Sequence, residues 1–372
     1  MSLSTVEDYY RRAAEVMDPV SFGYFDGAAG EERTHRLNSS SYDRIRIRPR
    51  QLMDVEFRRM SRTFLGEHFP MPVGISPTAL QKLAHPEGER ATARAAAKVG
   101  IPYVMSSMAS STIDEVVQAA PEGVRWMQTY IHRNRNIARA LVRQAESNGF
   151  TALVLTIDSP VLGIMKSEVR AENNVPNDVW YEVFRDFERQ GVITDGDDIA
   201  IVDDFDQSLT WKDVEWLMSI TKLPVIVKGV LTKEDAIRAV ETGVAAILVS
   251  NHGGRQLDSI SATIEVLPEI VRAVGGQIPI IVDGGVSKGT DIFKALAYGA
   301  DMVFLGRAIL WGLAVNGQKG IEDVLEILRN EFDNAMALAG CSSLCDIGKD
   351  RVIHEEEYNA SAVVSAIKEL KM

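Results

Sequence analysis

Short apolar runs recur along the chain from residue 71 onwards, and segments with helical spacing of apolar positions separate them. The runs are continuous rather than alternating, which is typical of parallel strands covered on both faces. We therefore predict eight strands, at 71–75, 101–105, 124–130, 152–157, 223–227, 245–249, 278–282 and 301–305. The patterns between them predict helices, at 87–99, 136–148, 233–242, 262–274 and 290–298.

The regular alternation of strand and helix favours an α/β fold. Eight repeats favour a (β/α)8 TIM barrel over an open sheet, which usually has fewer strands. Residues 1–65 are without this rhythm and are predicted to be an N-terminal helical segment, with 66–350 as the barrel of a single domain, 1–372. The long acidic segment 160–208 follows the fourth strand and is predicted to be a lid-like loop. A solvated loop with no role in chemistry is the alternative, and a helix at about 209–219 follows it.

Composition adds the size of the core and the sign of the charge. With 372 residues, 46% of them hydrophobic, the chain can bury a large core, and its net charge of -12 argues against broad binding to nucleic acids or anionic membranes. No apolar run reaches the roughly 18 residues of a membrane span, and the N-terminus does not resemble a secretory signal. Cys341 and Cys345 are predicted to be reduced thiols rather than a disulfide or metal ligands, which favours a cytoplasmic location.

The segment 250–258, Ser-Asn-His-Gly-Gly-Arg-Gln-Leu-Asp, directly follows the sixth predicted strand. In a barrel of this kind the carboxyl ends of the strands meet on one face, and active sites lie there. His252 can take a proton near neutral pH, and the guanidinium of Arg255 suits a carboxylate. Together they predict abstraction of a proton from a substrate that carries a carboxylate.

The other predicted strands also end in polar or glycine-rich segments. A single polar residue there is often only a helix cap, but the whole set predicts a large polar ligand. The glycine-rich ends of the seventh and eighth strands predict a phosphate site, and the dinucleotide motif after a first strand is absent. Together with Lys228, these features are compatible with two phosphate-bearing cofactors, flavin mononucleotide (FMN) and pyridoxal phosphate. The residues concerned are Pro77, Thr78, Ala79, Ser106, Gln128, Tyr130, Thr156, Asp158, Lys228, Asp283, Gly284, Gly285, Gly306 and Arg307.

Segment 250–258 resembles the signature of the FMN-dependent (S)-2-hydroxy acid oxidases and dehydrogenases, above all the glycolate oxidase type. Segments 77–79, 85–89, 156–163 and 283–286 support the resemblance, which extends over nearly the whole chain. It implies oxidation of an (S)-2-hydroxy acid to the 2-oxo acid with FMN as cofactor. It further implies oxygen as the acceptor, hydrogen peroxide as the second product, and a homotetramer.

The resemblance also implies a role for each matching residue. His252 would take the substrate's hydroxyl proton as a hydride moves to flavin N5, and Asp158 would stabilise the charged imidazole. Arg255, Tyr24 and Tyr130 would bind the substrate. The cofactor would be bound by Pro77, Thr78, Ala79, Ser106, Gln128, Thr156, Lys228, Ser250, Asp283, Gly284, Gly285, Ser287, Gly306 and Arg307.

Three substitutions depart from the family pattern. Met165 stands in place of a second arginine at the substrate, which Lys166 could replace, and Met108 stands in place of a tryptophan of the pocket. Ser287 stands in place of an arginine at the phosphate. These departures keep two alternatives open, an FMN enzyme for a non-standard 2-hydroxy compound and an FMN-binding protein without turnover. The C-terminal residues 370–372 only loosely resemble a peroxisomal signal.

Overall fold

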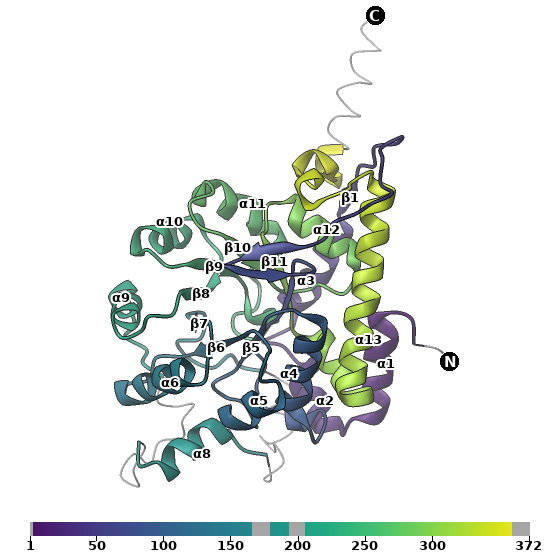
Figure 1. Ribbon diagram of the computed structural model, residues 1–372. Helices are drawn as coiled ribbons and strands as arrows, with labels where there is room; N and C mark the ends of the chain where they lie inside the picture. Colours follow the sequence, from purple (N-terminus) through teal and green to yellow (C-terminus); the bar gives the residue numbers. More distant parts are fainter. Residues whose placement is uncertain (1–2, 166–178, 193–204, 359–372) are drawn as a thin grey trace, which may run out of the picture.

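The computed structural model describes residues 3–165, 179–192 and 205–358 (Figure 1). Lys166, much of segment 160–208 and the C-terminal tripeptide lie outside these residues. Eight parallel strands close into a barrel in the order β10-β11-β4-β5-β6-β7-β8-β9, which confirms the predicted (β/α)8 TIM barrel. The strands are β4 (Val73–Ile75), β5 (Tyr103–Met105), β6 (Arg125–Thr129), β7 (Ala152–Thr156), β8 (Val225–Val230), β9 (Ala246–Val249), β10 (Ile280–Val282) and β11 (Met302–Leu305).

Each predicted strand overlaps one of these strands, and each predicted helix overlaps a helix outside the barrel. Figure 1 shows the helices around the strands, with the long α13 alongside α1. α13 contains a break at Asn316 and Gly317, whose backbone angles are not helical. The helices of the barrel are α4 (Gly88–Val99), α5 (Ile113–Ala119), α6 (Arg135–Ser147), α9 (Trp211–Ser219), α10 (Lys233–Thr242), α11 (Thr263–Val274), α12 (Gly289–Ala297) and α13 (Arg307–Ala339).

Large apolar side chains fill the amino-terminal half of the barrel. The Trp126 ring stacks on Phe304, with ring centroids 5.4 Å apart. Gly74 leaves the space for Phe304, because a Cβ at Gly74 would lie 2.4 Å from that ring. The hairpin β2 (Arg62–Phe64) and β3 (Glu67–Phe69) adds the buried Phe64 and Phe69 to the same cluster. The barrel is therefore closed at this end, and space for a ligand can lie only toward the carboxyl ends of the strands.

The first 65 residues are only partly helical. They form α1 (Val6–Val16), α2 (Pro19–Asp26) and α3 (Arg33–Asp43), but also β1 (Ile45–Ile47), which pairs with β12 (Val352–His354). The prediction of a helical segment was incomplete because these strands are three residues long and their partners are distant in sequence. Such pairing leaves no local periodicity.

Segment 160–208 is not a loop without structure of its own, as the sequence suggested. Within it, α8 (Glu182–Arg189) buries Val183, Phe184 and Phe187 against the molecule. These apolar positions recur at helical spacing over a length too short to stand out in the sequence. Whether the segment acts as a lid stays a prediction.

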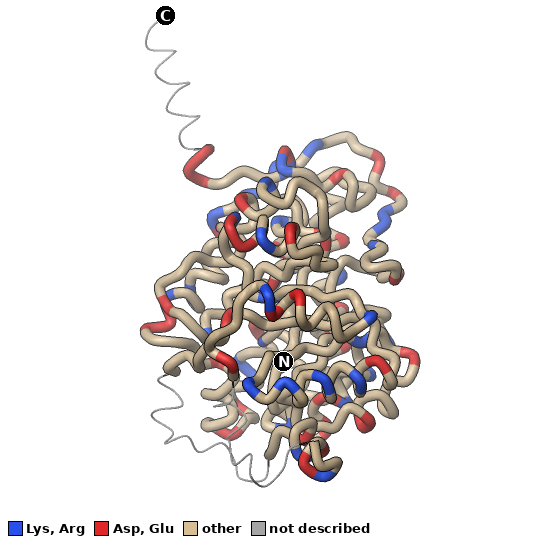
Figure 2. The backbone as a smooth tube through the Cα atoms, turned by 90° about the vertical axis from the view of Figure 1, so that its left-hand side faces the viewer, with Lys and Arg blue, Asp and Glu red and all other residues tan. Residues whose placement is uncertain are grey.

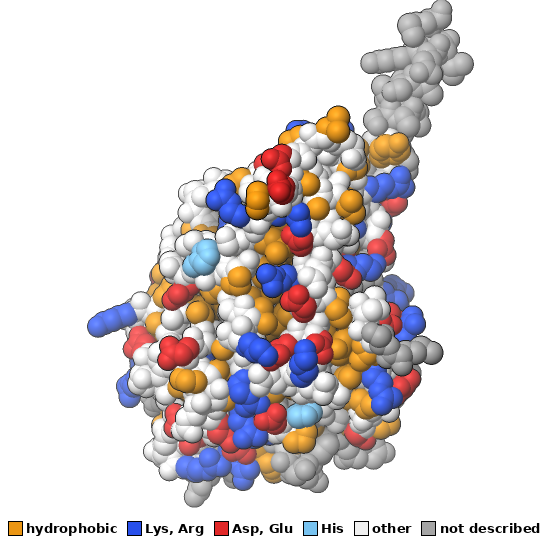
Figure 3. All heavy atoms as spheres, turned by 45° about the vertical axis from the view of Figure 1, so that its right-hand side comes forward, with side chains coloured by type: hydrophobic (Ala, Val, Ile, Leu, Met, Phe, Trp, Pro, Cys, Tyr) orange, Lys and Arg blue, Asp and Glu red, His pale blue; other side chains and the backbone are white. Residues whose placement is uncertain are grey.

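Positions of Lys and Arg are interspersed with positions of Asp and Glu along the backbone in the view of Figure 2. Figure 3 shows the same mixture on one face of the molecule, with small apolar areas between the charges. Among the helices of the described ranges, none is both long and apolar enough to span a bilayer.

Candidate active site

A layer of polar side chains lies inside the carboxyl-terminal half of the barrel. Side chains alternate along a strand, so the residue two places after an inward apolar residue also points inward. Val104 is followed in this way by Ser106, and Trp126 by Gln128. The layer consists of buried Ser76, Ser106, Gln128, Thr156, Lys228, Ser250 and Asp283, with at least one residue from seven of the eight strands or their ends.

Gln128 connects three neighbouring strand ends. Its Oε1 accepts a hydrogen bond from Ser107 N at 3.1 Å, and its Nε2 donates to Thr156 Oγ1 at 3.0 Å. Ser106 Oγ also donates to Oε1, at 3.4 Å. The amide is thereby held in one orientation, and these residues form a fixed polar wall.

His252 and Asp158 form the central pair of the site. His252 Nδ1 lies 2.8 Å from Asp158 Oδ1, so that Nε2 is the ring nitrogen left to face a substrate. The backbone places His252 by an unusual turn, because His252 has a φ of 56° in the left-handed region and two glycines with positive φ follow it. Non-glycine residues adopt this conformation at a cost in energy, and such residues cluster at functional sites.

Burial and charge set the protonation of this pair. Burial and the neighbouring Lys228 ammonium lower the pKa of His252, against the opposing effect of Asp158. Burial alone would raise the pKa of Asp158, but Lys228 and His252 outweigh it and hold that pKa well below its usual range. At neutral pH the pair is therefore a neutral imidazole beside a carboxylate, which is the state of a general base.

Lys228, Asp283 and Asp158 each have a polar atom in the site that is buried without a hydrogen-bond partner among the described residues. These atoms are Lys228 Nζ, Asp283 Oδ1 and Asp158 Oδ2. Lys228 Nζ is 3.6 Å from Asp158 Oδ2, and Asp283 Oδ2 accepts from Ser76 Oγ at 2.9 Å. A buried ammonium and a buried carboxylate oxygen of this kind require a polar ligand. The carbonyl groups of a flavin ring and the hydroxyls of its ribityl chain fit this requirement.

Arg255 and Tyr24 lie together at the rim. The Arg255 guanidinium lies 5.0 Å from the centre of the Tyr24 ring, and its Nη1 donates to Tyr24 O at 2.6 Å and to Gly27 O at 3.1 Å. Cation–π contact and hydrogen bonds to the end of α2 fix the guanidinium beside the predicted substrate tyrosine.

In the predicted phosphate region, the guanidinium of Arg307 already donates hydrogen bonds to backbone carbonyl groups, which the sequence did not suggest. Arg307 Nε donates to Phe25 O at 2.7 Å, while Nη1 donates to Gly253 O and Nη2 to Gly27 O, both at 2.9 Å. Burial and the neighbouring Arg255 lower the pKa of Arg307 to about 9.

Ser287 is also engaged within the protein. The backbone N–H groups of Ser287 and Lys288 donate to Asp291 Oδ2, at 3.1 and 3.0 Å, and thereby cap α12. The Lys288 ammonium lies 3.5 Å from Asp43 Oδ1. The phosphate roles of Ser287 and Arg307, like those of Gly284, Gly285 and Gly306, stay predictions.

The pocket residues Met108 and Met165 are both buried. Met165 is held by a bridge to Ala29 in the N-terminal segment. Tyr130 stacks on Phe205, with ring centroids 4.4 Å apart, and burial raises the pKa of the Tyr130 phenol well above its usual range. The Tyr130 phenol thus stays protonated beside the Phe205 ring.

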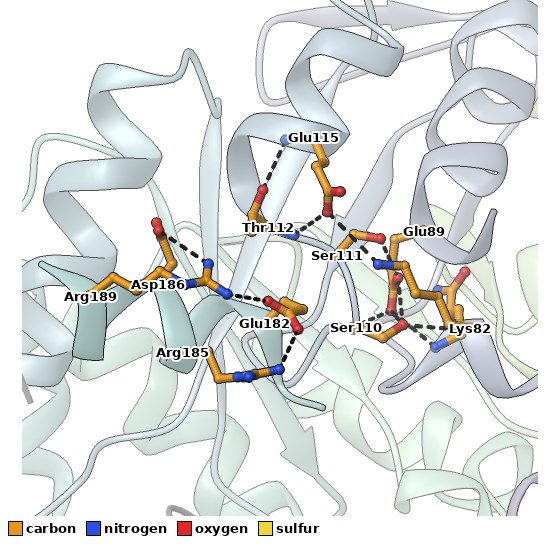
Figure 4. Close-up of polar contacts among 11 residues, drawn as sticks. Lys82, Glu89, Ser110, Ser111, Thr112, Glu115, Glu182, Arg185, Asp186 and Arg189 are labelled. Carbon is orange, nitrogen blue, oxygen red and sulfur yellow. Dashed lines mark hydrogen bonds and ion pairs between the residues drawn. The ribbon is translucent and has the colours of Figure 1, made fainter. Parts of the chain in front are cut away.

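Buried Glu89 holds together the two loops that carry Pro77, Thr78, Ala79 and Met108. Its Oε1 accepts from Gln81 N at 3.0 Å and Ser110 N at 2.8 Å, and its Oε2 accepts from Ser111 Oγ at 2.9 Å. Figure 4 shows this carboxylate between Lys82 and the two serines. The loops after β4 and β5 are therefore fixed to each other rather than independent.

Four residues with contacts in the site were not predicted from the sequence, namely Ser76, Ser159, Gln256 and Phe205. Ser76 could have been found, because it lies two residues after inward-facing Gly74. Ser159 and Gln256 belong to the recognised motifs but have no ionisable group that singles them out. Phe205 follows an acidic stretch and gave no pattern, because its contacts are with distant residues.

Comparisons with known proteins show which proteins this chain is similar to. The model of the FMN-dependent dehydrogenase family matches residues 13–354. Glycolate oxidase 3 of Oryza sativa subsp. indica is 44% identical over 361 residues, which cover 95% of this chain and 97% of the relative. 2-Hydroxyacid oxidase 1 of Homo sapiens is 42% identical over 356 residues, which cover 94% and 96%. The structure of a mandelate oxidase variant with (S)-mandelic acid has a TM-score of 0.85 and 36% identity, with coverage of 95% and 98%.

Proposed function

Because this chain belongs to the FMN-dependent dehydrogenase family and is an FMN-dependent enzyme of the hydroxy acid oxidase type, we propose that it oxidises (S)-2-hydroxy acids at His252. The observation that carries the proposal is the pairing of His252 with Asp158, whose Nδ1 and Oδ1 atoms are 2.8 Å apart. Lys228 beside them supports a flavin ring as the partner, since its Nζ is buried without a hydrogen-bond partner among the described residues.

The reaction requires a proton and a hydride to leave the substrate carbinol. FMN supplies the hydride acceptor when it is bound. His252 Nε2 takes the hydroxyl proton, and Asp158 Oδ1 stabilises the resulting imidazolium through Nδ1–H. Lys228 would hold the flavin ring through its ammonium group and would supply positive charge beside it. Of the candidate residues, His252 and Asp158 thus move and stabilise the proton, and Lys228 supports the cofactor.

Substrate binding is assigned to Arg255, Tyr24 and Tyr130. Arg255 pairs with the substrate carboxylate through guanidinium donors, and the neutral Tyr130 phenol donates a hydrogen bond. Met165 stands where the family has a second guanidinium, so carboxylate binding depends more on Arg255 here. We propose that the preferred substrates have longer or aromatic tails, whose burial against Met108, Met165 and neighbouring rings offsets the weaker hold on the carboxylate. A 2-hydroxy compound that relies less on a carboxylate is the second candidate, and Met165 favours it.

Oxygen is the proposed electron acceptor, with hydrogen peroxide as the product, and the proposed assembly is a homotetramer. The support for the acceptor is that the relatives are named as oxidases. The amount of peroxide released per 2-oxo acid formed tests whether oxygen is the acceptor. Light scattering of the holoenzyme tests whether the assembly is a tetramer.

Anaerobic mixing of the FMN-loaded protein with a panel of 2-hydroxy acids tests the proposal, with loss of flavin absorbance as the signal. We expect His252→Ala to retain FMN and to reduce it about 10²- to 10⁴-fold more slowly, since this is the usual contribution of a general base. His68→Ala is the matched control, because His68 is exposed on the hairpin at the other end of the barrel. Normal flavin reduction by His252→Ala would contradict the proposed base.

A further inference from the structure

Ser159 directly follows Asp158 and contacts several groups of the active site. Its Oγ lies 3.0 Å from Asp158 Oδ1 and 3.4 Å from His252 Nδ1. Gln256 Nε2, from the loop after β9, also donates a short hydrogen bond to this hydroxyl. Ser159 is buried, so water does not satisfy it in place of these groups.

The direction of each hydrogen bond follows from the chemistry of the groups. Gln256 Oε1 accepts from Gly163 N at 2.7 Å, which fixes the amide so that Nε2 faces Ser159. An amide nitrogen only donates, so Ser159 Oγ accepts from Gln256 and gives its single proton to Asp158 Oδ1. A directed chain therefore runs from Gly163 through Gln256 and Ser159 to Asp158.

Two donors consequently share one carboxylate oxygen. Asp158 Oδ1 receives the Ser159 hydroxyl at 3.0 Å and His252 Nδ1 at 2.8 Å. We propose that Ser159 and Gln256 are positioning residues that divide Asp158 Oδ1 between two donors and so limit how firmly this carboxylate holds a proton on His252. The proposal rests on the proposed role of His252 as the base.

The protonation of His252 depends on the charges around it, so a change in the hydrogen bonds of Asp158 affects it. Asp158 at the end of β7 favours the protonated imidazole, while Lys228 on β8 and Arg255 on the loop of His252 itself disfavour it. Ser159 thus acts on the group that favours protonation, and a base that releases its proton readily is needed for each turnover. Gln256 strengthens the effect, because a hydroxyl that accepts a hydrogen bond becomes a better donor.

The same series of hydrogen bonds fixes the segment that leads to Met165. Gly163 approaches the backbone of the base loop so closely that a Cβ would lie 2.1 Å from Arg255 O. The hydrogen bond from Gly163 N to Gln256 Oε1 holds this contact. Loss of the Gln256 side chain should therefore loosen one wall of the substrate pocket as well as weaken the Ser159 donor.

The test compares Ser159→Ala with Ser159→Thr, which keeps the hydroxyl. In the FMN-loaded enzyme, the midpoint of the acidic limb of flavin reduction should move upward by roughly half to one pH unit in Ser159→Ala and stay in place in Ser159→Thr. Gln256→Ala should move the midpoint in the same direction and also raise KM. In the Ser159→Ala background, Gln256→Ala should not move the midpoint further, because it acts through the Ser159 hydroxyl.

A second readout separates this proposal from the proposed function. The His252 imidazole is titrated by NMR in the FMN-loaded protein without substrate, and assigned by comparison with His252→Gln. An upward shift in Ser159→Ala, absent in Ser159→Thr, supports the proposal even if no 2-hydroxy acid reduces the flavin. An unchanged His252 titration in both Ser159→Ala and Gln256→Ala would overturn it, even if wild-type turnover is normal.

Discussion

His252 combines a left-handed backbone conformation with an imidazole that is 24% exposed, and its titration should control the reaction. Its pKa is lowered by burial and by Lys228, so the residue stays neutral to a lower pH than an ordinary histidine, whose pKa is about 6.5. A neutral base is needed to accept the proton. The rate of flavin reduction should therefore be constant at neutral pH and fall as the pH drops through a midpoint below about 6.5. Rapid mixing across this pH range measures it, and a midpoint above 7 would show that Asp158 outweighs burial and Lys228.

Met165 offers the sharpest test of substrate preference. Met165→Arg should restore a guanidinium near the substrate carboxylate, and a hydrogen bond to a charged group contributes about 1.5–3 kcal/mol. We expect kcat/KM for glycolate to rise about 10- to 100-fold, with a smaller gain for acids with aromatic tails. Steady-state kinetics with both substrate types measures the difference.

Met53→Arg is the control for that change, because Met53 is exposed and the same charge is added outside the site. If wild-type protein already oxidises glycolate efficiently and Met165→Arg adds nothing, another group performs the role of the second guanidinium.

Residues of the site could be predicted where chemistry or strand alternation singles them out. Gln128 and Thr156 were predicted to lie at neighbouring strand ends, and they are joined by a 3.0 Å hydrogen bond. The hydrogen bonds of Arg307 could not be predicted, because two of its acceptors are carbonyl groups near the end of α2. Sequence position indicates which side chains meet at a strand end, but not which backbone groups reach them from elsewhere.

At the scale of elements, Phe205 links segment 160–208 to the site. Its ring stacks on Tyr130 and lies edge-on to His132, with centroids 4.4 and 5.2 Å away. Aromatic pairs of this kind contribute about 0.5–1.5 kcal/mol beyond area burial. Phe205→Ala should therefore lower kcat/KM by about 10-fold. The effect should be mainly on KM, since the pair of His252 and Asp158 is untouched.

The control for Phe205→Ala is Phe57→Ala, which removes an exposed ring. An unchanged KM in Phe205→Ala would show that the end of the segment has no part in substrate binding.

The strands of the barrel and most of its helices were predictable from apolar runs and from apolar positions at helical spacing, but α5 and α13 were not among the predicted helices. β8 even continues to Val230, beyond the predicted end, through Lys228. Elements outside that repeat were not predictable. β1 needs β12 as its partner, and α8 is only 8 residues long, so neither has a local signal strong enough to define it.

At the scale of the whole molecule, FMN binding should raise the thermal stability of the protein. A ligand at a hundred times its Kd stabilises the folded state by about 2.7 kcal/mol, which corresponds to roughly 3–4 °C in Tm for a protein of this size. Thermal unfolding of the apoprotein should therefore shift upward by several degrees with FMN and less with riboflavin, which has no phosphate. An equal shift with both would show that Gly284, Gly285 and Gly306 do not hold a phosphate.

The aromatic cluster at the amino-terminal end of the barrel has a consequence for the timing of turnover. Among the described residues, Phe64, Phe69, Trp126 and Phe304 fill that end of the barrel, so we expect substrate and product to pass through the opposite end. The 2-oxo acid product, the electron acceptor and the next substrate must then all pass through the same open end of the barrel. We infer that the two half-reactions run in sequence, and that lingering product delays reoxidation as well as the next round of substrate entry.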